Sequence, residues 1–171
     1  GLPLRPAALA RACQGAPRLG LLRADGDNLG AILQRGLGEG ASLSRLVALS
    51  RSLDLFFSGY VDHLVAESCR EAVQVIFSGG DDLLVVGAWD RLPALAHHIR
   101  RSFTAYGAGN PALSLSAAIV GGRSRRPFWA LLEGSREDEA LAKGWRRPDG
   151  KEKDALTILG QPLSWEELKV C

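Results

Sequence analysis

Two short apolar runs in the middle of the chain flank a centre rich in glycine and aspartate. The runs cover residues 72–77 and 82–86, and residues 78–82 read Ser-Gly-Gly-Asp-Asp. Runs of this length that are rich in Val, Ile and Phe and bounded by turn residues predict the two strands of a β-hairpin. Adjacent glycines supply the positive φ that a tight turn needs. The pattern therefore predicts a hairpin whose turn presents two adjacent carboxylates, Asp81 and Asp82.

The same apolar pattern predicts the remaining elements. Apolar residues recur every three or four positions in some segments, which is typical of helices, and alternate or form short runs in others, which is typical of strands. The predicted helices cover about 43–65, 92–103 and 127–143, a short helix covers 7–12, and further strands cover 18–24, 113–119 and 155–159. The first part of this order is β-α-β-β-α-β. We therefore expect an α+β fold, a ferredoxin-like βαββαβ sheet with its helices on one face, extended by a C-terminal helix and strand.

The first 17 residues differ from the rest of the chain. Three prolines surround a short Ala-rich run, which predicts a linker with a short helix whose first turn holds Pro6. We therefore divide the chain into a linker at 1–17 and one domain at 18–171.

Composition fits this division. The 171 residues are 46% apolar with a mean hydropathy near zero, which predicts a soluble globular domain with a full core. The net charge of +2 is too small to indicate a nucleic-acid-binding coat, and three widely spaced cysteines form neither a disulfide framework nor a zinc ligand set. The sequence has no run of membrane-spanning length and no signal-peptide pattern, so we expect a cytoplasmic protein without membrane contact. Because it contains no Met, we expect a domain of a longer protein.

A second acidic segment, Asp-Gly-Asp-Asn-Leu-Gly at 25–30, follows the strand predicted at 18–24. Taken alone it is an ordinary turn or helix cap, and the hairpin turn taken alone is equally well a solvated turn. In a ferredoxin-like sheet, however, the first strand and the central hairpin are neighbours. Asp25 and Asp27 then approach the hairpin carboxylates, and so many carboxylates do not stay ionised together without a cation. The sequence therefore predicts a site for a hard divalent ion.

Four motifs in this order resemble one protein family. They are residues 25–30, Ser-Arg-Leu through Phe-Phe between 44 and 57, Ser-Gly-Gly-Asp-Asp-Leu at 78–83, and Gly-Ala-Trp-Asp at 87–90. The set is similar to the second palm domain of the large polymerase-like subunit of type III CRISPR effector complexes, with subtype III-A the nearest. GGDEF-type nucleotide cyclases resemble it more distantly. The resemblance implies a palm fold of the polymerase and cyclase type.

The resemblance also implies an activity. In that family the palm is a nucleotidyltransferase that joins ATP through 3′–5′ linkages into cyclic oligoadenylates, an antiviral second messenger, once the complex has bound target RNA. It uses Mg²⁺ or Mn²⁺, with a two-metal site expected. The residues implied in metal binding are Asp25, Gly26, Asp81 and Asp82, of which the last two are also catalytic. The residues implied in nucleotide binding are Ser78, Gly79, Gly80, Asn28, Leu29, Gly30, Lys143 and Lys153.

Basic residues near the C-terminal end fit this chemistry. GGDEF cyclases place a phosphate-binding lysine on the helix before the last strand, and Lys143 occupies the similar place. Their next basic residue follows a short turn, whereas residues 144–150 lengthen the turn here, so the sequence leaves Lys151 and Lys153 both open. Lysines neutralise polyphosphate through charge-assisted contacts. Without that role each is a solvated surface charge.

The resemblance implies partners as well. The family's subunit also carries a first palm and an HD nuclease domain, and its nucleotide pocket is shared between two palms. We therefore expect contacts with those domains and with other effector subunits, indirect contact with guide and target RNA, and a homodimer when the chain is isolated. We also expect three arginines to lie in an exposed loop that contacts RNA or another subunit: Arg123, Arg125 and Arg126.

Two alternatives remain at this point. One is a GGDEF-type cyclic dinucleotide cyclase, although the motif here reads Asp-Asp followed by Leu83-Leu84 and lacks the Glu-Phe ending of that family. The other is a non-catalytic ferredoxin-like module that binds RNA or subunits through its sheet. Such a sheet presents exposed aromatic residues, for which Phe77 is the one candidate in the sequence.

Overall fold

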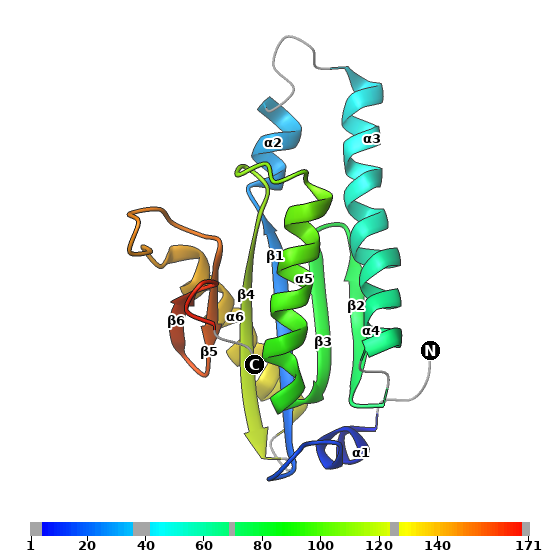
Figure 1. Cartoon of the computed structure of the whole chain (residues 1–171), viewed down its shortest axis with the longest axis vertical. Helices are drawn as coiled ribbons and strands as arrows, with labels where there is room; N and C mark the ends of the chain where they lie inside the picture. Colours follow the sequence, from blue (N-terminus) through cyan, green and yellow to red (C-terminus); the bar gives the residue numbers. More distant parts are fainter. Residues whose placement is uncertain (1–4, 36–41, 69–70, 124–126, 169–171) are drawn as a thin grey trace.

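A single six-stranded sheet is the scaffold of the fold (Figure 1). The computed structural model describes residues 5–35, 42–68, 71–123 and 127–168. The strands are β1 Arg18–Asp27, β2 Val73–Gly79, β3 Asp82–Ala88, β4 Ser114–Arg123, β5 Ala155–Ile158 and β6 Gln161–Ser164. The helices are α1 Pro6–Arg11, α2 Leu29–Arg35, α3 Leu43–Asp54, α4 Asp62–Ser68, α5 Leu92–Tyr106 and α6 Phe128–Gly144. A π-helical segment, Leu55–Val61, joins α3 to α4, and a short 3-10 helix, Trp89–Arg91, precedes α5.

The strand order is β2-β3-β1-β4-β5-β6. β1 runs antiparallel to both β3 and β4, and β2 runs antiparallel to β3, which is the ferredoxin-like arrangement. The α+β class predicted from the apolar pattern is thus confirmed. The C-terminal addition holds one strand more than predicted, because β6 pairs antiparallel with β5. β6 is a four-residue edge strand containing Pro162, and proline in a short run argues against a strand unless it lies at an edge.

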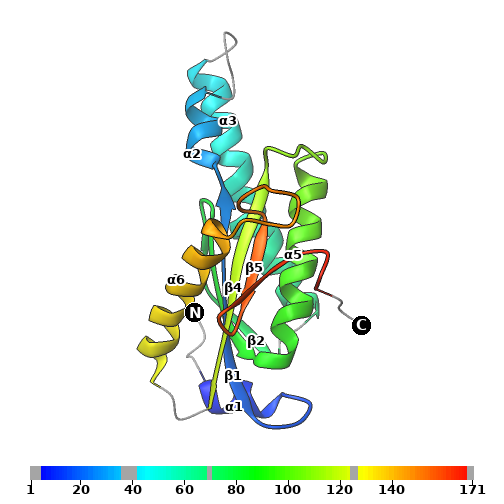
Figure 2. The same ribbon diagram turned by 90° about the vertical axis from the view of Figure 1, so that its left-hand side faces the viewer.

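Alternate residues of the central strands enter two cores on opposite faces of the sheet. Leu22 and Val85 are buried in the core that α5 and the α3–α4 helix cover. Leu21 and Val86 are buried in the second core, together with Leu131 of α6. Figures 1 and 2 show α5 with α3 and α4 on one side of the sheet and α6 on the other. The helices of the ferredoxin-like unit therefore share one face, as predicted, and α6 covers part of the other.

The short helix α1 also packs on the sheet. Its Leu9 is buried against Leu19 and Leu21 in the second core, so this part of the segment 1–17 contacts the domain directly. Within the described ranges, no helix combines the length and the apolar character that a membrane crossing requires.

Two strands extend beyond the predicted limits. β1 continues to Asp27, so Asp25 lies within the strand, paired with Asp82 of β3, and not in a turn after it. β4 continues through Gly121 and Gly122 to Arg123, where a loop was predicted. Pairing with long neighbouring strands overrides the weak strand propensity of Asp and Gly, which a local pattern does not reveal. Arg125 and Arg126 lie outside the described residues.

The long helix predicted at 43–65 contains a π-helical segment. Phe56 and Phe57 of that segment are fully buried, and their rings lie 5.2 Å and 5.6 Å from the ring of Phe103 in α5. π-helical turns are rare and occur frequently at functional sites. The helix α2 was not predicted, because residues 25–30 were interpreted as a turn.

A buried carboxylate joins the end of β1 to β4 and to the segment before β5. Asp27 is 1% exposed and accepts hydrogen bonds from Ser114 Oγ and Ser116 Oγ, both at 2.8 Å, and from the backbone N–H of Asp154 at 3.0 Å. A carboxylate can be buried at low cost only when its oxygens are satisfied in this way. Asp27 therefore has a structural role and does not join the hairpin carboxylates, contrary to the expectation from sequence.

Close packing at Gly87 of β3 can be tested by substitution. A Cβ at this position would lie 2.5 Å from the carbonyl oxygen of Ala72 and 2.8 Å from Cα of Val73. Because backbone must move to make room, we expect Gly87→Ala to lower the free energy of unfolding by about 1–3 kcal/mol in urea denaturation followed by circular dichroism. Gly134→Ala in α6 is the control, since its added Cβ would lie 3.8 Å from Cγ1 of Val120, and we expect it to raise stability by about 0.5–1 kcal/mol. Equal losses in both variants would contradict the packing explanation.

The network around Asp27 makes a second prediction about stability. Asp27→Ala leaves two hydroxyls and one backbone N–H without their acceptor, so we expect the free energy of unfolding to fall by about 2–3 kcal/mol. Asp27→Asn keeps one acceptor oxygen and is expected to lose less. A loss below about 0.5 kcal/mol for Asp27→Ala, as for an ordinary surface position, would show that the network does not stabilise the fold.

Candidate functional site

A two-residue turn connects β2 to β3. Gly79 pairs with Asp82, so the turn residues are Gly80 and Asp81. Gly80 has φ +65°, a left-handed conformation that glycine adopts without steric cost. Asp82 is the first residue of β3, and the turn itself therefore presents only one of the two carboxylates that the sequence placed there.

The helix packed behind the hairpin holds this turn. The backbone N–H of Gly80 donates to Oδ1 of Asp54 at 3.1 Å, and the Oγ of Ser78 donates to the carbonyl oxygen of Phe57. Asp54 is the last residue of α3, and Phe57 belongs to the π-helical segment. The irregular part of the long helix thus anchors the hairpin. Ser78 uses its proton inside the protein, and its oxygen keeps acceptor capacity for a ligand.

The end of β1 brings the predicted metal-binding residues together. Asp25 and Asp82 are direct cross-strand partners, so their side chains share one face of the sheet. Asp81 lies beside Gly26, whose backbone N–H donates to the carbonyl oxygen of Asp81 at 3.0 Å. A Cβ on Gly26 would lie 3.5 Å from Cβ of Asp81 and would collide with the side chain of Leu29. A side chain at position 26 would therefore have to displace the side chain of Leu29, whereas the turn itself lies at an ordinary contact distance.

Negative charge exceeds positive charge around Asp25. The Nζ of Lys143, on α6, donates to Asp25 and lies 2.8 Å from Oε1 of Glu139. Burial raises the pKa of Asp25 to about 6 against the opposing effect of Lys143, and the charges of Asp81 and Glu139 add to the rise. Burial alone would lower the pKa of Lys143, but its hydrogen bonds to Asp25 and Glu139 raise it overall. Counting Arg23, which pairs with Glu139 and Asp82, two cationic side chains face four carboxylates, and the excess of negative charge favours a further cation.

The carboxylates suit a hard cation whose remaining coordination positions are filled by a ligand. Asp82 is 42% exposed with Arg23 Nη2 3.9 Å away, and Asp81 makes no side-chain hydrogen bond or ion pair with the described residues. In the part of the chain that the structure describes, no group of three His, Cys, Asp or Glu side chains is arranged to hold a metal ion by itself. Mg²⁺ is usually held by one or two carboxylates together with water and substrate phosphates. The oxygen donors of Asp25, Asp81 and Asp82 match that mode of binding.

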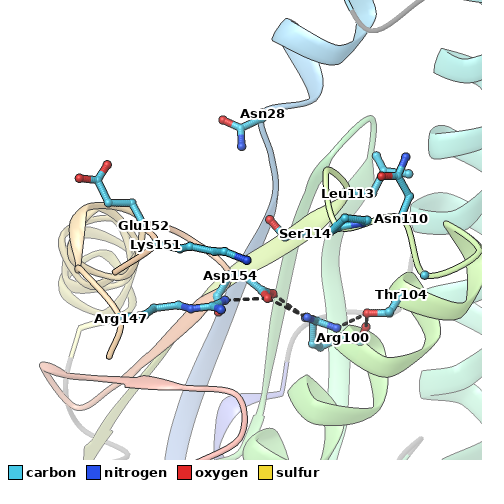
Figure 3. A pocket seen from close by; sticks show the side chains of 12 residues that line it. Asn28, Arg100, Thr104, Asn110, Leu113, Ser114, Arg147, Lys151, Glu152 and Asp154 are labelled. Atoms are coloured by element: carbon cyan, nitrogen blue, oxygen red, sulfur yellow. Dashed lines mark hydrogen bonds and ion pairs between the residues drawn. The ribbon is translucent and has the colours of Figure 1, made fainter. Parts of the chain in front are cut away.

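A second set of polar residues lies where β1 ends and α2 begins. Asn28 has φ +59°, and its Oδ1 accepts a hydrogen bond from Nζ of Lys153 at 2.6 Å. A hollow of about 310 Å³ opens beside it (Figure 3). The residues that line the hollow include Asn28, Arg100, Thr104, Ser114, Arg147 and Lys151. Of the two lysines that the sequence left open, Lys153 therefore reaches the end of β1, whereas Lys151 borders the hollow.

Three further residues were predicted to bind nucleotide, and they differ in how exposed they are: Leu29, Gly30 and Gly79. Leu29 is 2% exposed and packs in the same core as Leu22 and Val85, so its side chain is not available to a ligand. Gly30 is exposed at the start of α2, and Gly79 ends β2 beside the carboxylate of Asp54.

Three residues of the site were not predicted from the sequence. Glu139 lies four positions before Lys143, which places both on one helix face, so this signal was available. Arg23, which contacts Glu139 and Asp82, lies two positions before Asp25 and would have been found had the strand been extended. Asp54 had no local signal, because its contact with Gly80 depends on how the helix packs against the hairpin.

Comparison with known proteins identifies the family. Residues 18–157 match the family model described as Cas10/Cmr2, second palm domain. Two curated relatives, both called CRISPR system single-strand-specific deoxyribonuclease Cas10/Csm1 (subtype III-A), come from Methanocaldococcus jannaschii and Enterococcus italicus. They are 34% and 43% identical over 89% and 91% of this chain, which spans 21% and 20% of their lengths. The chain thus spans about a fifth of the curated relatives it matches.

Solved structures agree with this assignment. The apo Csm1–Csm4 cassette superposes with a TM-score of 0.79 at 26% identity, over 94% of this chain and 24% of that chain. Cassettes in complex with one ATP and with cA4 each superpose with a TM-score of 0.76 at 29% identity, over 94% and 95% of this chain and 25% of each of theirs. The chain therefore belongs to the Cas10/Cmr2 second palm domain family.

Proposed function

We propose that this chain is a nucleotidyltransferase palm that converts ATP into 3′–5′-linked cyclic oligoadenylates within a type III-A CRISPR RNA-guided antiviral complex. The observation that carries the proposal is the cross-strand pairing of Asp25 with Asp82. Beside this pair lies the carboxylate of Asp81, which makes no hydrogen bond or ion pair with the described residues. Csm1–Csm4 cassettes that share the fold have been solved with ATP, pppApApA, cA3 and cA4, which supports the same substrate and product class here.

The name of the curated relatives points to a different reaction, hydrolysis of single-stranded DNA. That name belongs to proteins more than four times as long as this chain. We assign nucleotidyl transfer to this region because its match is to the second palm, and we place the nuclease in a separate HD domain of the subunit.

The proposal includes Mg²⁺ or Mn²⁺, in one or two sites, held by Asp25, Asp81, Asp82 and the backbone of Gly26. When bound, such an ion lowers the pKa of the attacking 3′-hydroxyl and offsets the charge of the α-phosphate. The excess of negative charge around Asp25 supports this part of the proposal.

The chain's own groups bind and orient the nucleotide. Lys143 and Lys153 approach the end of β1 from α6 and from the segment before β5, so their ammonium groups can neutralise the polyphosphate. The amide of Asn28 and the backbone of Gly30 lie on the same stretch. Gly80 has no side chain to block the approach of a ligand to Asp81.

Partners complete the proposed activity. We propose that a second palm faces the site, supplied by another domain of the same subunit or, in the isolated chain, by a second copy. The HD nuclease domain and other effector subunits contact the chain directly, and guide and target RNA act on it indirectly, in the cytoplasm. The fold likeness to Csm1 in Csm1–Csm4 cassettes supports the place of other effector subunits in this proposal.

Two other functions make different predictions. A GGDEF-type cyclase would prefer GTP over ATP. An RNA-binding or subunit-binding module would need neither nucleotide nor metal, and its sheet would carry stacking residues, of which Phe77, 53% exposed on β2, is the candidate.

Calorimetric titration tests the proposal. We expect ATP to bind the chain when Mn²⁺ is present and not when it is omitted, with GTP at least about tenfold weaker. We expect Asp81→Ala/Asp82→Ala to abolish the metal-dependent binding, because each charged contact to a metal–phosphate ligand contributes about 1.5–3 kcal/mol.

The matched control is Asp62→Ala/Glu67→Ala, which removes the same charge from two exposed positions on α4. It is expected to bind ATP like the unsubstituted chain. Tighter binding of GTP would favour the cyclase, and equal loss in both double variants would mean that net charge, not the hairpin site, controls binding. A chain that binds neither nucleotide, or that binds ATP without metal, would contradict the proposal.

A further inference from the structure

The segment between α6 and β5 adopts a conformation that its own sequence does not favour. Lys153 and Asp154 have φ of +65° and +48°, in the left-handed region, although neither is glycine. Consecutive residues in this region persist only where the surrounding structure holds them, and such positions concentrate at ligand sites. The source of that support is therefore informative about function.

An ion-pair cluster centred on Asp154 supplies the support. Its carboxylate accepts from Nε and Nη2 of Arg100, at 2.7 Å and 2.8 Å, and from Nη1 of Arg147 at 2.9 Å. Its backbone N–H donates to the buried Asp27. The three charged side chains are only 13–19% exposed, and Figure 3 shows Arg100 and Arg147 meeting at the carboxylate from opposite sides. A bidentate guanidinium fixes the orientation of a carboxylate as well as its position.

The cluster lies one residue away from Lys153. While Asp154 is held by α5 and by Asp27, the neighbouring Lys153 directs its Nζ to Oδ1 of Asn28 at the end of β1. The segment 145–154 is thus attached at the end of β1 by two neighbouring contacts, Asp154 with Asp27 and Lys153 with Asn28, the residue that follows the strand.

The guanidinium groups in the hollow are already paired with protein carboxylates. Arg100 is bound to Asp154 and Thr104, and Arg147 is bound to Asp154 and Asp149. With their donors used in this way, they hold the segment and are poorly suited to receive a phosphate. Lys153, in contrast, contacts one neutral amide oxygen, which a charged phosphate oxygen can replace at a gain in electrostatic energy.

We propose that the Arg100–Asp154–Arg147 cluster is a clamp that positions Lys153 for the terminal phosphates of the nucleotide, which makes Arg100 a positioning residue of the site. This inference rests on the proposed function. Without the clamp, the ten-residue segment before β5 would have to order Lys153 at the moment of binding, and that ordering reduces affinity. With the clamp, the ammonium is placed before the ligand arrives.

The experiment compares ATP with AMP, which lacks the terminal phosphates. Both are titrated with Mn²⁺ into the unsubstituted chain, Arg100→Ala, and Arg101→Ala as the matched control, since Arg101 is the next residue of α5, is exposed, and makes no hydrogen bond or ion pair with the described residues. We expect Arg100→Ala to raise the Kd for ATP about tenfold and to change the Kd for AMP less than twofold. Asp154→Asn, which removes the charge but keeps a residue tolerant of left-handed φ, is expected to behave like Arg100→Ala.

Hydrogen exchange measured by mass spectrometry provides a readout without nucleotide. We expect Arg100→Ala to accelerate exchange in 145–154 and to leave β1 and β3 unchanged, whereas general loss of structure would accelerate all three. If the unsubstituted chain binds ATP but Arg100→Ala and Arg101→Ala bind it equally, or if ATP and AMP weaken together, the clamp is overturned while the proposed function stands. If the unsubstituted chain binds neither nucleotide, the proposed function fails, and unchanged exchange in 145–154 would separately show that the cluster does not hold the segment.

Discussion

The geometry of the site depends on the carboxyl-terminal end of β1, the strand that lies between β3 and β4. Three polar side chains lie within four residues there: Asp25 and Asp27 in the strand, and Asn28 directly after it. Carboxylates at the end of a central strand are costly unless each finds a cation or hydrogen-bond donors. Each of the three side chains is met by a different segment: Lys143 of α6, the serines of β4, and Lys153 before β5. One electrostatic requirement thus brings three distant parts of the chain to a single point.

The two aspartates of β1 have different roles because different side chains surround them. Asp27 uses three of the roughly four acceptor positions of a carboxylate for hydrogen bonds inside the protein, so it has little capacity left for a ligand. Asp25 shares one ammonium with Glu139 and remains in an excess of negative charge, which favours an added cation. The motif Asp-Gly-Asp does not reveal this difference. It arises from Ser114 and Ser116 of the neighbouring strand β4, which is distant in the sequence.

Sequence reasoning predicted the elements with strong periodicity and the topology that follows from their order. The nearness of Asp25 to the hairpin was predictable for the same reason, since the first and third strands of this fold are neighbours. The length of β1, the π-helical segment and the contact of Asp54 with Gly80 were not predictable. Each depends on pairing or packing between residues far apart in the chain, whereas periodicity reports only on local burial.

The two sides of the site are held by different physical means. On the hairpin side, hydrogen bonds from Ser78 and Gly80 to the long helix fix the turn, and the helix is in turn fixed by buried aromatic packing. On the other side, ion pairs to Asp154 fix the segment that carries Lys153. Exposed ion pairs are weakened by salt, but these are mostly buried and are therefore screened much less. Burial of the cluster thus helps a long connection with little regular structure to hold a charged side chain in place.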